Sequence, residues 1–101
     1  MKTSTKVVDG RAVIRLHGRF DFSAYRAFRS SCAPLLAASD VSELHVNLEK
    51  VEHLDRSALG MLLLLKARAD RSSKRLVLTH CYGAVKQALE LANFNKIFNV
   101  A

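Results

Sequence analysis

The chain is poor in residues that break, cross-link or rigidify a fold. Its 101 residues include one proline, four glycines, two cysteines and no tryptophan, while 50% are hydrophobic. A chain with this much apolar surface and so little proline is not typical of disorder. Cys32 and Cys81 lie far apart and match no metal-binding or redox spacing, so we interpret them as two reduced thiols.

Long apolar segments are also missing. The most apolar run, 58–65, is far shorter than the roughly 20 residues that a membrane-spanning helix requires. The first residues lead into no apolar segment of the kind found in signal peptides. The length suits one domain over residues 1–101, with enough buried surface for a core without cross-links. We therefore expect a single cytoplasmic domain that does not insert into a membrane.

The sequence also lacks the common signatures of catalysis and cofactor binding. It has no glycine-rich phosphate loop and no Gly-x-Ser-x-Gly nucleophile motif. The four histidines, at positions 17, 45, 53 and 80, follow no known metal-ligand pattern. These absences predict a protein that is not an enzyme and that uses no cofactor and no metal.

What the chain does have is an excess of positive charge. Sixteen Lys and Arg residues against nine Asp and Glu give a formal net charge of +7. Such a charge suits nucleic acid, an anionic membrane surface or an acidic protein partner. The basic residues are scattered and no aromatic residues are interleaved with them, as a stacking platform for single strands would need. We therefore expect no direct binding to nucleic acid.

Hydrophobic periodicity predicts alternating strands and helices. Asp9-Gly10 indicates a hairpin turn, Gly18 a strand end, 50–54 a loop, and Pro34 a kink or restart within a helix. Strands are predicted over 3–8, 11–17, 43–49 and 75–79, helices over 23–38, 56–70 and 83–93, and a short terminal strand within 97–100. This order predicts an α/β domain with a mixed sheet of four or five strands, an antiparallel hairpin followed by parallel strands.

The helix predicted over 56–70 is apolar nearly all round. Asp55 is its expected N-cap, and a core arc is formed by Ala58, Leu62, Leu65 and Ala69. A neighbouring arc carries Ser57, Met61, Leu64 and Arg68. Gly60, Leu63, Ala67 and Arg71 lie nearly opposite the core arc, so the outer face, with its two leucines, either meets a partner or is covered by the neighbouring helices. Ser57 either assists the cap or, lying at a helix start, carries a phosphate at little electrostatic cost.

Several segments together resemble the STAS domain of bacterial anti-sigma factor antagonists. The similar stretches are Leu16–Asp21, Val46–Leu48 with Leu54–Gly60, Val85–Leu89 and Phe94–Phe98. The version Ser-Ala-Leu-Gly followed by Met and four leucines is similar to members that act with response-regulator phosphatases and anti-sigma factors in surface attachment or motility.

The resemblance implies a protein-binding switch without catalytic activity. In the family, the residue after the motif aspartate is phosphorylated by a partner kinase, and the unphosphorylated form binds the anti-sigma factor. Here that position is Arg56, which cannot accept a phosphate, while Ser57 matches the second hydroxyl position. Either Ser57 takes over as acceptor or this member is not switched in the usual way.

The resemblance and the loop positions together predict a partner site around the start of the 56–70 helix. Loops that follow successive parallel strands gather at one sheet edge, which brings the turn at 19–22 to the same place. We expect contacts from Arg19, Asp21, Phe22, His53, Asp55, Arg56, Ser57, Gly60, Met61 and Leu64. The partner would be an anti-sigma factor, kinase or phosphatase. The alternative is a STAS accessory subunit of a lipid transporter that is never phosphorylated.

Overall fold

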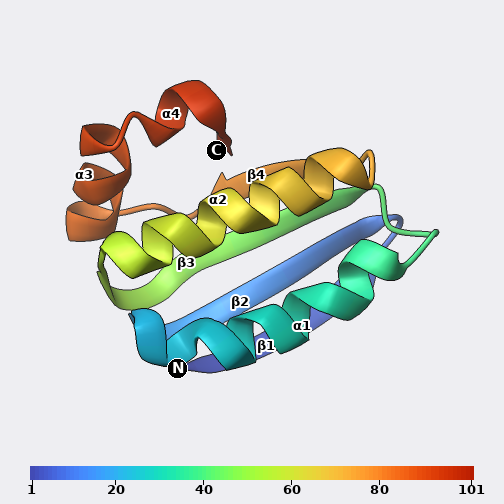
Figure 1. The fold of residues 1–101 in the computed structure, drawn as a ribbon, viewed down its shortest axis with the longest axis horizontal. Coiled ribbons are helices and arrows are strands. Elements are labelled where there is room, and N and C mark those ends of the chain that lie inside the picture. Colours follow the sequence, from blue (N-terminus) through green and yellow to red (C-terminus); the bar gives the residue numbers. More distant parts are fainter.

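The computed structural model describes residues 1–101 and contains one mixed five-stranded sheet (Figure 1). The strands follow one another across the sheet in chain order. The first pair is antiparallel and every later pair is parallel. The strands are β1 (Lys2–Val8), β2 (Arg11–Phe20), β3 (Glu43–Leu54), β4 (Arg75–Thr79) and β5 (Asn99–Val100). The expected α/β class and the mixed sheet are confirmed.

The opening hairpin forms where the turn signal predicted it. Asp9 (φ 51°) and Gly10 (φ 80°) both adopt positive φ values, which the two central residues of a type I′ turn require. Val8 then pairs with Arg11 across the turn. The twist of this turn type matches that of the strands, so the turn places β1 against β2.

The helices cover one face of the sheet. They are η1 (Phe22–Ala24), α1 (Tyr25–Ala37), α2 (Arg56–Arg71), α3 (Gly83–Leu91) and α4 (Phe94–Ile97). Figure 1 shows α1 lying along β1 and β2, and α2 lying along β3 and β4. Each helix contributes apolar side chains to one buried cluster that packs against the strands. The cluster includes Ile14, Leu44, Phe28, Leu62 and Leu89, whereas Phe22 of η1 is exposed and lies outside it. No helix has both the length and the apolar character needed to span a membrane.

Two expected strand ends were wrong, because β2 and β3 remain paired beyond them. β2 continues through Gly18, which takes a φ of 108° beside a shift in register, so this glycine permits a bulge and does not end the strand. β3 extends to Leu54 through the segment expected to be a loop. Phe20 is fully buried and pairs with Leu54, and burial at these strand ends favours continued pairing over the local polar sequence.

Pro34 does not restart α1, which runs without interruption from Tyr25 to Ala37. A proline removes one helical hydrogen bond, here to the carbonyl of Ser30, and both residues are exposed, so water can satisfy that carbonyl. The C-terminal region also differs from expectation. Asn93 adopts a left-handed conformation (φ 58°) between α3 and α4, and the short terminal strand is confined to residues 99–100.

Lys74 is the one buried charged side chain in the chain. Its Nζ donates hydrogen bonds of 2.6 Å to the carbonyls of Ala38 and Val41. These carbonyls belong to the connection between α1 and β3, whereas Lys74 directly precedes β4. The lysine therefore fastens this connection to the amino-terminal edge of the parallel strands, opposite the candidate site.

Candidate functional site

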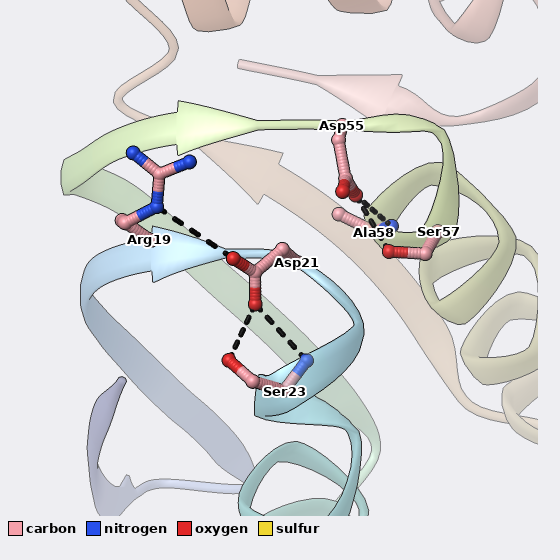
Figure 2. Close-up of polar contacts among 6 residues, drawn as sticks. All are labelled: Arg19, Asp21, Ser23, Asp55, Ser57 and Ala58. Carbon is pink, nitrogen blue, oxygen red and sulfur yellow. Dashed lines mark hydrogen bonds and ion pairs between the residues drawn. The ribbon is translucent and has the colours of Figure 1, made fainter.

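The candidate site begins where β2 and β3 end side by side. Phe20 pairs with Leu54, and the amide of Asp55 donates a hydrogen bond to the carbonyl of Phe20 (N···O 3.3 Å). The turns that follow the two strands therefore start from one fixed point. Figure 2 shows the resulting neighbourhood, with Asp21 leaving β2 and Asp55 leaving β3.

Asp55 caps α2, as the sequence predicted. Its backbone is extended (φ −111°, ψ −174°), and Oδ1 accepts hydrogen bonds from the Ala58 amide (3.0 Å) and the Ser57 hydroxyl (2.6 Å). The Ser57 hydroxyl, followed by the Ala58 amide, lowers the pKa of the Asp55 carboxyl below its ordinary value. The carboxylate is therefore held in its charged form at the positive end of the helix.

A second Asp-x-Ser group lies directly beside the first. Asp21 accepts hydrogen bonds from the Ser23 amide (3.0 Å) and the Ser23 hydroxyl (2.5 Å), and Arg19 Nε lies 3.6 Å from its other oxygen (Figure 2). The Ser23 hydroxyl is the main cause of a lowered pKa at Asp21. The sequence analysis expected Asp21 as a contact residue but did not pair it with Ser23 as a second Asp-x-Ser group. The repeat of Asp-x-Ser after two neighbouring strands was the sequence signal that could have shown that the turns after β2 and β3 are built alike.

Arg56 and Ser57 differ sharply in their surroundings. Arg56 is the first residue of α2, is exposed, and makes no ion pair. Ser57 is half-buried and its hydroxyl proton points at Asp55. The site thus presents the free guanidinium of Arg56 to solvent and keeps the hydroxyl of the next residue, Ser57, engaged.

Nine of the ten expected contact residues are at least partly exposed, on the last residues of β2 and β3, in the turns that follow them and on α2 as far as Leu64. Phe22 is 76% exposed and stacks on Tyr25 (centroids 6.4 Å apart), and Leu64 is 50% exposed. Half-buried members are Asp21, Asp55 and Ser57, and exposed members are Arg19, Phe22, His53, Arg56, Gly60 and Leu64. We call these nine residues the α2-start surface.

Met61 does not belong to this surface, contrary to the expectation from the helical wheel. It is 5% exposed and is part of the core cluster, beside Phe28 and Cys32 of α1. The wheel placed Met61 next to the core arc, but it could not show on which side α1 packs. Because α1 covers that side, Leu63 and Leu64 are the leucines that α2 leaves exposed, at 43% and 50%.

No group of three or more His, Cys, Asp or Glu residues is arranged to hold a metal ion. Cys32 is buried, and burial raises the pKa of its thiol to about 12. Burial likewise raises the pKa of Cys81. Neither thiol is therefore activated as a nucleophile.

Comparison with known proteins shows the family to which the chain belongs. The family model described as "Mlab, STAS domain" matches residues 4–99. A STAS-domain containing protein, PA14_20770 of Pseudomonas aeruginosa (strain UCBPP-PA14), is 34% identical over 98% of this chain and 97% of its own length. The chain therefore belongs to the STAS domain family.

Solved structures of anti-sigma factor antagonists have the same fold. One from Mycobacterium paratuberculosis matches with a TM-score of 0.87 and 20% identity, over 98% of this chain and 83% of that one. Unphosphorylated SpoIIAA matches with a TM-score of 0.81 and 20% identity, over 99% of this chain and 88% of that one. At these identities the likeness concerns the fold of the chain.

Proposed function

We propose that this STAS domain is a protein-binding regulatory module of the anti-sigma factor antagonist type, without catalytic activity. It would act in the cytoplasm and bind an anti-sigma factor, kinase or phosphatase through the α2-start surface. The observation that carries the proposal is the pairing of an exposed Arg56 with a Ser57 hydroxyl engaged by Asp55 (2.6 Å), at the position where the resembled family places its switch. The family membership and the antagonist fold support it.

The chemistry of this helix start favours binding over catalysis. The carboxylates Asp21 and Asp55 are both occupied by the serine and backbone donors of their own turns. Their pKa values are lowered, which is the opposite of what a general acid at neutral pH needs. What remains available is a set of exposed side chains, apolar at Phe22 and Leu64 and basic at Arg19 and Arg56. A surface of this composition suits a protein partner with acidic groups around an apolar contact.

Arg56 defines the state in which the module would act. In the resembled family, the residue after the motif aspartate is phosphorylated, and a phosphate there would add roughly two negative charges at this helix start. Arg56 brings one permanent positive charge to the same place and removes the hydroxyl. We infer that the chain is held in the state equivalent to the unphosphorylated, partner-binding form.

The test is affinity capture from the native cell, followed by mass spectrometry, with three forms of the tagged chain. The wild type should retain an anti-sigma factor, kinase or phosphatase, and Leu64→Asp should lose it. Val8→Asp is the matched control, because Val8 is 53% exposed and pairs with Arg11 at the start of β2, the opposite end of that strand from the α2-start surface. Recovery of a membrane-associated ATPase in place of those proteins would support the lipid-transporter alternative. Equal retention by wild type and Leu64→Asp would contradict the proposed surface.

A further inference from the structure

A groove runs between α1 and α2, from Leu64 of the α2-start surface toward the C-terminal ends of the two helices. Near Leu64 the groove is filled by core side chains, with a remaining volume of only about 10 Å³. Further along, it opens to about 480 Å³ between the C-terminal halves of the two helices. Arg29 and Arg68 line both parts, so the two form one continuous feature. We call the wider part the arginine groove; Arg29, Ala33, Leu36, Ala37, Arg68 and Arg71 line it.

The arginine groove contains three guanidinium groups and no carboxylate. The ion pairs of the chain are Arg19–Asp21, His45–Glu43 and Lys66–Asp70, so none involves a groove arginine. Asp70, next to Arg71 in the sequence, is held by Lys66 at 2.9 Å. Arg68 and Arg71 lie in the last turn of α2, where their charges interact favourably with the negative end of the helix dipole. That dipole supplies only a partial charge, so it does not neutralise the two arginines.

Arg29 is oriented without being neutralised. Its Nη1 donates a hydrogen bond of 2.8 Å to the phenol oxygen of Tyr25. The Arg29 guanidinium, with a smaller contribution from Arg68, lowers the pKa of the Tyr25 phenol. Tyr25 places a phenol beside Arg29 where an ion pair would need a carboxylate, so no carboxylate neutralises the positive charge of the groove. A guanidinium retains several donors in a planar fork, which a carboxylate can bind through two parallel hydrogen bonds.

Between the arginines, the groove presents small apolar side chains. Ala33 and Ala37 are one helical turn apart on α1, both exposed, and Leu36 is half-buried between them. The small side chains allow the backbone of a docking helix to approach closely. The flanking arginines would repel basic side chains on that helix. The groove is thus complementary to a helix with an apolar stripe bordered by carboxylates.

We propose that the arginine groove docks an acidic amphipathic α-helix of the protein partner. The proposal rests on the proposed function only in taking the partner to be a protein. It adds a second contact surface, distinct from the α2-start surface, and states what chemistry occupies it. Glu or Asp residues spaced three or four apart on that helix would meet Arg29, Arg68 and Arg71, while its alanine or leucine stripe would cover Ala33, Leu36 and Ala37.

The direct test uses the full chain and two synthetic helical peptides. One peptide carries Leu and Ala on one face and Glu on the other, and its counterpart carries Lys in place of Glu. Amide chemical shifts measured at near-physiological salt should change along α1 and α2 with the Glu peptide only. The double variant Arg29→Gln/Arg71→Gln should bind the Glu peptide about tenfold or more weakly, since both side chains are exposed and their loss does not disturb the core.

The matched control is Arg11→Gln/Arg15→Gln, which removes the same charge from exposed positions on β2. The neighbours Ala12, Ile14 and Leu16 point into the core under the helices, so Arg11 and Arg15 lie on the opposite face of the sheet. This control should keep the wild-type affinity within about twofold, because charges separated by more than about 8 Å are largely screened at this salt concentration. An equal loss in both double variants would overturn the proposal, as it would show attraction by net charge alone.

A second measurement separates this proposal from the proposed function. The groove variant should retain less of the captured partner than the control variant, whereas Arg56→Ser should bind the Glu peptide as the wild type does. Undiminished partner capture by the groove variant would refute the groove and leave the proposed function standing. Tighter binding of a short single-stranded oligonucleotide than of the Glu peptide, lost in the groove variant, would also refute it in favour of nucleic acid.

Discussion

The amide of Asp55 donates a hydrogen bond to the carbonyl of Phe20 (3.3 Å), which joins the start of α2 to the end of β2. Both β2 and β3 are followed by an aspartate that accepts a hydrogen bond from the serine hydroxyl two residues later. Ser23 donates to Asp21, and Ser57 donates to Asp55. The two turns are therefore built alike and held together at one sheet edge (Figure 2). A change in charge at either turn therefore changes the electrostatic potential at the other. The negative charge of Asp55 raises the pKa of Asp21, although the stronger effect of the Ser23 hydroxyl keeps that pKa below its ordinary value.

Replacing Asp55 with alanine should lower the thermal midpoint at pH 7, because the first turn of α2 loses its acceptor for the Ala58 amide. The folded-state pKa of Asp55 is below its ordinary value of 3.8, so its contribution is complete above that pH and is lost as the pH falls through the folded-state value. The difference between wild type and Asp55→Ala should therefore narrow below about pH 4. Thermal melts followed by circular dichroism from pH 7 to pH 3 measure it.

The control for this pH dependence is Asp40→Ala, because the exposed Asp40 carboxylate accepts no hydrogen bond and makes no ion pair. Its difference from wild type should stay small at every pH. A gap between wild type and Asp55→Ala that widens on acidification would show that Asp55 is not stabilised in its charged form.

Met61→Ala and Leu64→Ala should differ strongly although the two residues are neighbours on α2. Met61 is 5% exposed in the core, so its truncation should lower the free energy of unfolding by about 2–5 kcal/mol. Leu64 is 50% exposed, and its truncation should change stability far less while weakening partner capture. Urea denaturation gives the first quantity for both variants. Equal destabilisation by the two changes would mean that Leu64 is also a core residue.

Lys74→Met should lower the free energy of unfolding by about 1–3 kcal/mol, because the carbonyls of Ala38 and Val41 lose their buried donor. Lys66→Met is the control, since Lys66 makes only a surface pair with Asp70 four residues away, and its loss should cost less than about 1 kcal/mol. Urea denaturation of both variants decides the matter. A Lys74 variant as stable as the control would show that water replaces the lysine.

The sequence predicted the fold well where a signal was local. Asp9-Gly10 specified its hairpin, and Asp55 specified the start of α2. It failed where distant pairing decided the outcome. Gly18 looked like a strand end, but the match of Phe20 with Leu54 carries β2 and β3 past it. Met61 could be assigned to the core only once α1 was known to pack beside it. The arginine groove also depends on the packing of α1 against α2, so no local sequence pattern could predict it.

Arg56 is expected to keep this chain from being phosphorylated as other STAS switches are. Neighbouring side chains on a helix point about 100° apart, so a kinase that presents phosphate to position 56 is misaligned for Ser57. The Ser57 hydroxyl also donates its proton to Asp55 at 2.6 Å, and that carboxylate would repel an incoming phosphate. Incubation of the wild type with its cognate kinase and ATP should therefore leave its intact mass unchanged.

Arg56→Ser should create the missing acceptor at the first position of α2. Its phosphate would meet the free amides of the first turn and the positive end of the helix, although Asp55 would oppose it at close range. The added charge of about −2 should then release the partner, because a charged group is costly to desolvate against an apolar contact. Arg56→Ala controls for loss of the guanidinium alone and should stay unphosphorylated and bound. Stoichiometric phosphorylation of the wild type at Ser57 would instead show that the switch survives in this chain.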